Sequence, residues 1–263
     1  MGKIVSIHSF RGGTGKSNIT ANLAVQIAST RQRVGIVDTD IQSPGIHALF
    51  GLSEKSIQGS LNDFLWGNAA IDEVAYPLHE KASKTPERAF LKDMKLWLIP
   101  SSIRAEEITR ILQNGYNVST LNQGLHSLIV SLKLDYLFID THPGINEETL
   151  LSIAISHGLI IIMRPDQQDF QGTAVTVDIA RHLEVPELRL VVNKALSKYD
   201  TAQAKADIEN TYGVQVSAIL PLSEDVAANE SDNIFSVLQP EHPWSKGIAT
   251  IAADVAAFDA SYG

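Results

Sequence analysis

Short, nearly continuous runs of Val, Ile and Leu recur along the chain and alternate with longer segments whose apolar residues lie three or four positions apart. The first pattern is typical of strands buried on both faces of a parallel sheet, and the second is typical of amphipathic helices. The expected strands are Ile4–Ser9, Arg33–Asp38, Leu96–Pro100, Tyr136–Asp140, Gly158–Met163, Leu188–Asn193 and Val216–Leu220. The expected helices are Lys16–Thr30, Glu106–Asn114, Ser119–Leu132, Asn146–Ser156, Gly172–Leu183 and Ala202–Tyr212.

This alternation predicts an α/β fold with a doubly wound, mostly parallel sheet and helices on both faces, in which ligands bind outside the carboxyl ends of the strands. The chain has 263 residues and neither an internal repeat nor a low-complexity linker, so we expect one domain over residues 1–263. The stretch Pro77–Asp93 is charged and lacks periodicity, which predicts a flexible insertion there.

The first expected strand and helix are joined by the segment Phe10-Arg11-Gly12-Gly13-Thr14-Gly15-Lys16-Ser17. The strict phosphate-loop pattern, G-x-x-x-x-G-K-[ST], has glycine where this chain has Phe10. The rest keeps the chemistry: glycines let backbone N–H groups face a polyphosphate, Lys16 reaches the terminal phosphates, and Ser17 offers a hydroxyl to magnesium. The following helix adds the positive end of its dipole. The expected nucleotide-binding residues are Gly12, Gly13, Thr14, Gly15, Lys16, Ser17 and Asn18.

Acidic residues stand at the carboxyl ends of two expected strands, Asp38 and Asp40 after the second and Asp140 in the run Tyr136–Asp140. In such a fold these carboxylates face the phosphate loop, where they can hold a magnesium-bound water or orient an attacking one. Loop-capping aspartates are the alternative for the first pair. A later strand ends in Asn193, whose amide can both donate to and accept from an adenine edge.

Composition excludes several classes of site. The chain has no cysteine, which rules out disulfides, thiol catalysis and cysteine-held metals or iron–sulfur clusters within it. No apolar stretch approaches 18 residues and the chain leads directly into the first strand, so we expect a cytoplasmic protein without a leader or a membrane span. The net charge of −9 disfavours a broad DNA-binding face but leaves a local basic patch open.

The loop resembles the deviant Walker A loop of the ParA/MinD ATPases, KGGxGK[ST], and the resemblance covers Lys3 to about Val226 with its landmarks in the family's order. It implies Mg²⁺-dependent hydrolysis of ATP, slow without a partner. In that family the leading lysine reaches across a nucleotide-sandwich dimer to the partner's phosphates. Arg11 stands at this position here. It would act in trans as an arginine finger does, or else remain a cis or solvated contact. It further implies the following roles: catalysis by Lys16, Asp38 and Arg11, with Asp38 positioning the water; metal binding by Ser17, Asp40 and Asp140; adenine binding by Asn193 and Pro221.

Thr141-His142-Pro143-Gly144 follows the third acidic residue and resembles the family's D-T-P-x-G segment, with His142 where proline is usual. We expect His142 to be a solvent-side substitution rather than a catalytic base, because in-line attack by water needs no imidazole when Asp38 is available.

The chain's C-terminal part indicates the branch. Residues 246–258 carry an apolar stripe whose polar face has Asp254 and Asp259 rather than lysines, so a helix packed on the sheet is expected instead of a membrane anchor. Tyr262 alone is not the tyrosine cluster of the related tyrosine kinases.

The cargo-positioning branch remains, whose ATP-bound dimer binds non-specific DNA on the nucleoid until an adaptor protein stimulates hydrolysis. Arg11 in place of the signature lysine resembles the carboxysome-positioning members. The candidate DNA contacts are Arg181, Arg189, Lys194, Lys198 and Lys205, with a merely solvated surface as the alternative. Two other functions stay open: a small-molecule enzyme of the dethiobiotin-synthetase kind and a MinD-like division-site regulator.

Overall fold

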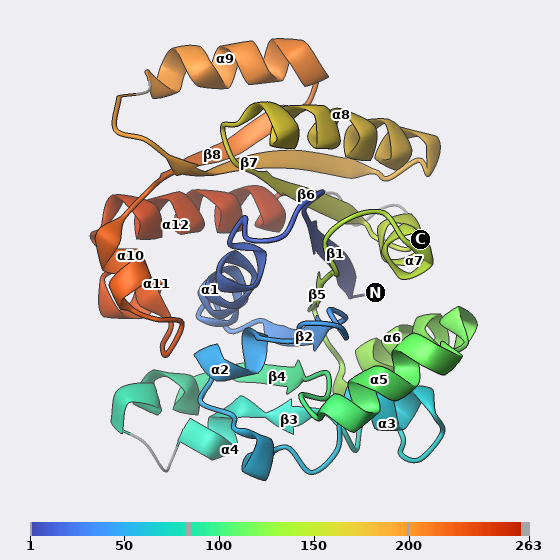
Figure 1. Cartoon of the computed structure of the whole chain (residues 1–263). Coiled ribbons are helices and arrows are strands. Elements are labelled where there is room, and N and C mark those ends of the chain that lie inside the picture. The colour runs from blue at the N-terminus through green and yellow to red at the C-terminus, as the bar shows by residue number, and fades with distance from the viewer. Residues whose placement is uncertain (1, 83–85, 199, 259–263) are drawn as a thin grey trace.

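The strands form one sheet in the order β3-β4-β2-β5-β1-β6-β7-β8 in the computed structural model, which describes residues 2–82, 86–198 and 200–258 (Figure 1). The strands are β1 (Lys3–His8), β2 (Arg33–Asp38), β3 (Tyr76–Pro77), β4 (Lys95–Ile99), β5 (Tyr136–Asp140), β6 (Gly158–Met163), β7 (Glu187–Ala195) and β8 (Gln215–Pro221). All neighbouring pairs are parallel except β3 with β4. The predicted α/β class and mostly parallel sheet are confirmed.

Helices connect the strands and lie on both faces of the sheet (Figure 1). The α-helices are α1 (Lys16–Ala28), α2 (Ile46–Leu49), α3 (Leu61–Leu65), α4 (Leu78–Ala82), α5 (Ala105–Asn114), α6 (Val118–Leu132), α7 (Glu147–Ala154), α8 (Gln167–His182), α9 (Thr201–Tyr212), α10 (Glu224–Ala228), α11 (Phe235–Leu238) and α12 (Pro243–Ala256). Two 3₁₀ helices, η1 (Glu54–Ser56) and η2 (Pro86–Asp93), complete the described elements.

The central strand β1 lies between β5 and β6, and the chain reverses its direction of strand addition there. Register pairs Ile7 of β1 with Asp140 of β5, and Asp140 in turn with Asp38 of β2. Because these strands are parallel, their carboxyl ends meet at one edge, where ligands bind in open α/β sheets. The phosphate loop therefore emerges directly beside two buried acidic residues.

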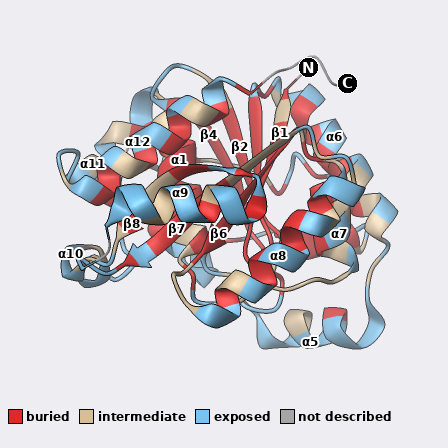
Figure 2. Ribbon diagram, turned by 90° about the horizontal axis from the view of Figure 1, so that it is seen from above, coloured by how far each residue is buried: buried red, intermediate tan, exposed pale blue. Residues whose placement is uncertain are grey.

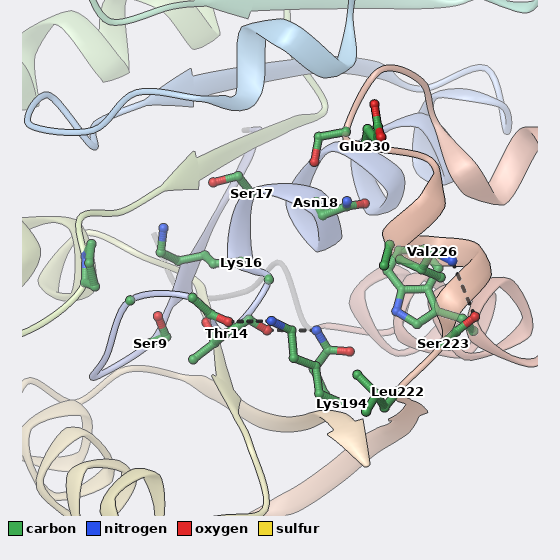
Figure 3. A pocket seen from close by; sticks show the side chains of 18 of the residues that line it. Ser9, Thr14, Lys16, Ser17, Asn18, Lys194, Leu222, Ser223, Val226 and Glu230 are labelled. Atoms are coloured by element: carbon green, nitrogen blue, oxygen red, sulfur yellow. Dashed lines mark hydrogen bonds between the residues drawn. The ribbon is translucent and has the colours of Figure 1, made fainter. Parts of the chain in front are cut away.

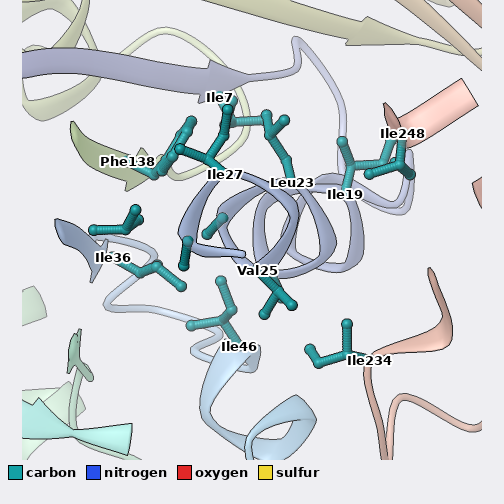
Figure 4. Packing of buried hydrophobic residues seen from close by; sticks show 14 of the residues in the cluster. Ile7, Ile19, Leu23, Val25, Ile27, Ile36, Ile46, Phe138, Ile234 and Ile248 are labelled. Atoms are coloured by element: carbon teal, nitrogen blue, oxygen red, sulfur yellow. The ribbon is translucent and has the colours of Figure 1, made fainter. Parts of the chain in front are cut away.

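Alternating residues of the strands face two different cores. Helix α1 lies in the first core, where Ile19, Leu23 and Ile27 pack with strand residues such as Ile7 and Phe138 (Figure 4). On the other face, separate apolar clusters form under α6 and under α8 with α9. The central strands β1, β2, β5 and β6 are almost wholly buried and the outer faces of the helices are exposed, as Figure 2 shows from above. This explains why the strands are continuous apolar runs.

Three features differ from the sequence prediction. Helix α8 begins five residues before the predicted Gly172, because the Asp166 side chain caps it at a start that has no apolar periodicity. The predicted flexible insertion Pro77–Asp93 instead contains α4 and η2 on its described part, and Leu78 and Leu91 are buried in the first core. The short antiparallel β3 was not predicted.

The C-terminal helix packs on the sheet as predicted. The stripe of α12 is buried against β8 and α1, with Ile248, Ile251 and Val255 fully covered. Asp259 and Tyr262 lie outside the described residues. Within the described part of the chain, no helix combines the length and the apolar character that crossing a bilayer requires.

Candidate functional site

A cavity of about 550 Å³ opens at the carboxyl edge of the sheet (Figure 3). The side chains of Ser9 and Lys16 lie on one side of it and those of Leu222 and Val226 on the other. Its volume is within the range of small-molecule and cofactor sites. It is lined by Ser9, Gly12, Gly13, Thr14, Gly15, Lys16, Ser17, Asn18, Asp40, Ser43, Pro143, Asn193, Lys194, Pro221, Leu222, Ser223, Val226, Ala227, Glu230, Ser231 and Trp244. All seven loop residues predicted to bind nucleotide are among them.

The phosphate loop is braced by the end of β7. Asn193 Nδ2 donates to the carbonyl oxygen of Thr14 at 2.8 Å, and Lys194 Nζ donates to that of Gly13 at 2.7 Å. Gly15 has φ +92° and precedes α1, and a Cβ there would lie 2.5 Å from Asn193 Nδ2. Glycine is thus required at this position both for the backbone conformation and for the approach of Asn193.

Lys16 and Asp140 form a buried ion pair at the floor of the site. Lys16 Nζ lies 3.2 Å from Asp140 Oδ1, which also accepts from Thr20 Oγ1 at 3.3 Å. Both side chains of the pair are less than a tenth exposed. The other carboxylate oxygen, Asp140 Oδ2, is buried and has no partner among the described residues. Unpartnered buried acceptors are uncommon, so this oxygen marks a place for a cation or a water.

Asp38 is fully buried behind the cavity rather than on its surface. Its pKa is raised well above the usual value, first by burial and then by the neighbouring charges of Asp140 and Asp40. Its two oxygens accept from the backbone N–H groups of Asp40 at 3.1 Å and Gly45 at 3.3 Å. Asp38 is therefore coupled to the segment that follows β2.

Asp40 lines the cavity and contacts His142. Asp40 Oδ1 lies 2.7 Å from His142 Nδ1 and accepts from the backbone N–H and the hydroxyl of Ser43 at 3.2 and 3.1 Å. The His142 side chain is only one-fifth exposed. The expectation that His142 is a solvent-side substitution is wrong, because it turns toward the acidic segment of a neighbouring strand.

His8 is buried at the end of β1, directly before the phosphate loop. Thr141 Oγ1 donates to Ile7 O, so it accepts from His8 Nδ1 at 2.8 Å, which places the ring hydrogen on Nδ1. Burial, with the charges of Lys16 and His142, lowers the pKa of His8 to about 3. His8 is therefore neutral and connects β1 to the segment after β5.

Phe10 and Arg11, the two residues that depart from the usual loop, both contact α8. The Phe10 ring occupies the space that a side chain at Gly172 would need. Arg11 Nη1 lies 3.7 Å from both Asp166 and Asp169, and its side chain is 40% exposed. Arg11 therefore lies beside the cavity without lining it.

The end of the cavity next to β7 and β8 combines predicted and unpredicted residues. Asn193 and Pro221 line it as expected. The Asn193 amide nitrogen donates to Thr14, and no described residue donates to the Asn193 amide oxygen. Leu222, Val226 and Trp244 also line it, but Leu222 follows β8, Val226 lies in α10 and Trp244 lies at the start of α12, and they share no motif. Only the closeness of Leu222 and Val226 to the predicted Pro221 in the sequence could have indicated them.

The five candidate DNA contacts do not form one face. Lys194 lies in the nucleotide cavity. Arg181 is bonded to the carbonyl of Tyr212, and Arg189 is paired with Glu187 at 3.0 Å near the start of β7. The start and end of that strand are separated by roughly 17 Å between positions 189 and 194. Of the remaining two, Lys198 precedes α9 and Lys205 lies within it.

The residues at the floor of the cavity fit Mg²⁺ bound together with a nucleotide. Among the described residues no three His, Cys, Asp or Glu side chains are close enough to hold a metal by themselves. Mg²⁺ is commonly bound by one or two carboxylates together with substrate phosphates and water. The Asp40 carboxylate and the Ser17 hydroxyl line the cavity, and the unpartnered Asp140 Oδ2 is buried next to Lys16.

A comparison with protein families matches this site. The model of the ParA family, described as NUBPL iron-transfer P-loop NTPases, matches residues 1–256. An uncharacterized ATP-binding protein of Methanocaldococcus jannaschii is 28% identical over 250 residues, which are 95% of this chain and 86% of that protein. An iron-sulfur cluster carrier protein of Pseudomonas fragi is 28% identical over 241 residues, covering 88% of this chain and 76% of its own length.

The fold has solved counterparts. The crystal structure of the cell division ATPase MinD of Pyrococcus furiosus superposes with a TM-score of 0.81, covering 98% of this chain and all of that one at 20% sequence identity. At this identity the likeness concerns the fold. It agrees with the family match in giving the chain the fold of a P-loop NTPase.

Proposed function

This chain belongs to the ParA family of P-loop NTPases, and on that premise we propose that it is a Mg²⁺-dependent ATPase whose ATP-bound dimer positions a cargo. One observation carries the proposal: the Lys16–Asp140 pair lies at the start of α1, below a phosphate loop whose residues line a cavity of about 550 Å³. That arrangement has the glycines, the lysine, the hydroxyl and the acidic residue of a nucleotide-hydrolysing site.

The residues divide the work as follows. Backbone N–H groups of Gly13 to Lys16 and the Lys16 ammonium hold the phosphates. Ser17, Asp40 and Asp140 would hold Mg²⁺, which when bound would neutralise charge that develops on the phosphates. Asp38, at the end of β2, is assigned to orienting the attacking water. Asn193 and Pro221 bind the adenine.

Carrying an iron–sulfur cluster is not part of the proposal. Relatives of this chain are named iron-sulfur cluster carrier proteins. Such clusters are held mainly by cysteine thiolates, and none of the 263 residues is a cysteine. The part that this chain shares with these relatives is the nucleotide site. ATP hydrolysis in this chain then changes its partner or its oligomeric state.

DNA contact is the weaker part of the proposal. Lys198 and Lys205 lie near each other in sequence around the start of α9, and dimerisation would double them. A few phosphate contacts per protomer suffice for weak, salt-sensitive binding. Carboxysomes as cargo remain a hypothesis that stands on Arg11 alone.

Size-exclusion chromatography with light scattering, with and without ATP and Mg²⁺, tests whether ATP switches the protein from monomer to dimer. We expect the wild type to form dimers transiently, Asp38→Ala to remain dimeric because hydrolysis is blocked, and Lys16→Ala to remain monomeric. Lys246→Ala is the matched control, since that lysine is 62% exposed and pairs only with exposed Glu241.

DNA retention on the same samples separates the two parts of the proposal. Retention of the Asp38→Ala dimer that is lost in Lys198→Glu/Lys205→Glu supports the DNA contact. Dimers that do not retain DNA would contradict the DNA contact but leave the ATP-dependent dimerisation in place. If every variant stays monomeric with ATP, the ATP-dependent dimerisation is contradicted. ATP turnover stimulated by a small acid or amine would favour the dethiobiotin-synthetase alternative.

A further inference from the structure

The contact between His142 and Asp40 joins two segments that lie far apart in the sequence. Asp40 follows β2 and His142 follows β5, and the two side chains meet at 2.7 Å beside the cavity. They are one-fifth and one-tenth exposed, respectively. A bond between two mostly buried polar groups at this place constrains how Asp40 faces the cavity.

The direction of the bond follows from the chemistry of its partners. A carboxylate oxygen only accepts, so His142 Nδ1 carries the hydrogen and donates it to Asp40 Oδ1. Ser43 directs its backbone N–H and its hydroxyl to that same oxygen. Three donors therefore converge on Oδ1, while Oδ2 has no donor among the described residues. Because Asp40 lines the cavity, its second oxygen is the one available there.

The histidine is itself held in place by its neighbours. Thr141 is bonded to His8 and to the carbonyl of Ile7, and Thr149 Oγ1 donates to the carbonyl of His142 at 3.4 Å. The ring is thus attached to the end of β5, the strand that also carries Asp140. Through His142, Asp40 takes its position from the strand that bears the other acidic residue of the site.

We propose that His142 is a positioning residue that holds Asp40 by one oxygen and so presents the other to the Mg²⁺ of a bound nucleotide. The inference rests on the proposed function, because it needs a Mg–nucleotide in the cavity. A proline at this position, as in the D-T-P-x-G segment, has no side-chain donor, so the device belongs to this chain's own sequence. Partners that orient metal ligands typically change metal affinity by about 10–100-fold when removed.

Calorimetric binding of ADP, first in EDTA and then with Mg²⁺ titrated in, tests the inference without requiring turnover. We expect His142→Ala to bind ADP in EDTA like the wild type but to need about tenfold more Mg²⁺. His142→Asn should regain most of the Mg²⁺ affinity, because its amide nitrogen takes nearly the place of Nδ1. His182→Ala is the matched control. His182 Nδ1 also lies 2.7 Å from an oxygen, the backbone carbonyl oxygen of Asp178, but on the exposed surface of α8.

A second comparison uses Asp40. If His142 acts through Asp40, adding His142→Ala to Asp40→Asn should cost no further Mg²⁺ affinity, whereas independent effects would add. Unchanged Mg²⁺ dependence in His142→Ala overturns the inference. Loss of ADP binding in EDTA also overturns it, since the histidine would then support the cavity as a whole. Failure of the wild type to bind ADP under either condition is the separate result that removes the proposed function.

Discussion

Two clusters of charged side chains flank the phosphate loop, and they differ in whether their charges balance. The cavity cluster consists of Lys16, Asp38, Asp40 and Asp140. The α8 cluster consists of Arg11, Arg164, Asp166 and Asp169. The first sets three carboxyl groups against one lysine, whereas the second pairs two arginines with two aspartates.

The consequences of this difference are visible in the hydrogen bonds. In the α8 cluster, Asp169 receives the backbone N–H and the guanidinium of Arg164 at 2.8 to 3.3 Å, and Asp166 caps α8. In the cavity cluster, Asp140 Oδ2 has no described partner and the pKa of Asp38 is raised by burial and by like charges. The unbalanced cluster therefore has unused capacity for a cation and the balanced one does not. We conclude that the α8 cluster supports the structure, while the cavity cluster is built for a ligand.

The largest expected effect is that of Lys16→Ala. It removes the cation of the cavity cluster and the contact to the terminal phosphates, so nucleotide affinity should fall about 100-fold. Calorimetric binding of ADP in EDTA measures this, with Lys246→Ala as the control. Affinity within threefold of the wild type would contradict the assignment of the cavity to phosphate.

Arg164→Ala tests the claim that the α8 cluster is structural. It leaves Asp169, whose side chain is 3% exposed, without its bidentate partner, and the free energy of unfolding should fall by about 2–3 kcal/mol. Urea unfolding measures this against Arg104→Ala, an arginine paired on the surface. ADP affinity should stay unchanged, and a large loss of affinity with little loss of stability would reverse the roles of the two clusters.

His8→Asn tests how the buried histidine beside the cavity cluster responds to acid. The pKa of folded His8 is about 3, below the ordinary 6.5, so the unfolded chain binds a proton that the folded chain does not as the pH falls below 6.5. Wild-type stability is thus lost between about pH 6.5 and 3. Asparagine keeps the donor to Thr141 but does not titrate. The variant should therefore keep roughly 2 kcal/mol of the free energy of unfolding that the wild type loses by pH 5. Urea unfolding at pH 7 and pH 5 gives the difference, and parallel losses in both proteins would refute it.

The smallest expected effect is that of Arg11→Ala on the isolated chain. Both of its ion pairs are 3.7 Å long and its side chain is 40% exposed, so stability should change by less than about 1 kcal/mol. ADP affinity of the monomer should not change. A fall in ATP hydrolysis confined to the dimer would then show that Arg11 leaves the α8 cluster and acts on the partner's nucleotide.

Most of the strands were predictable because a strand buried on both faces must be apolar at nearly every position, as Gly158–Met163 is. The start of α8 was not, since its first turn is polar and depends on the Asp166 cap. The segment at Pro77–Asp93 was mistaken for an insertion because its buried residues, Leu78 and Leu91, are too few and too far apart to show a period.

The sequence by itself determined the phosphate loop, its acidic neighbours and the doubly wound sheet, because each follows from local backbone conformation or from the period of apolar residues. Only the tertiary structure decided where the long or polar side chains point. It pairs Arg11 with α8, brings Lys194 to the phosphate loop instead of a DNA face, and turns His142 toward Asp40. These partners lie 102 to 181 positions apart in the sequence, so no local pattern encodes them. They are chosen by charge and geometry once the strand ends have been brought together.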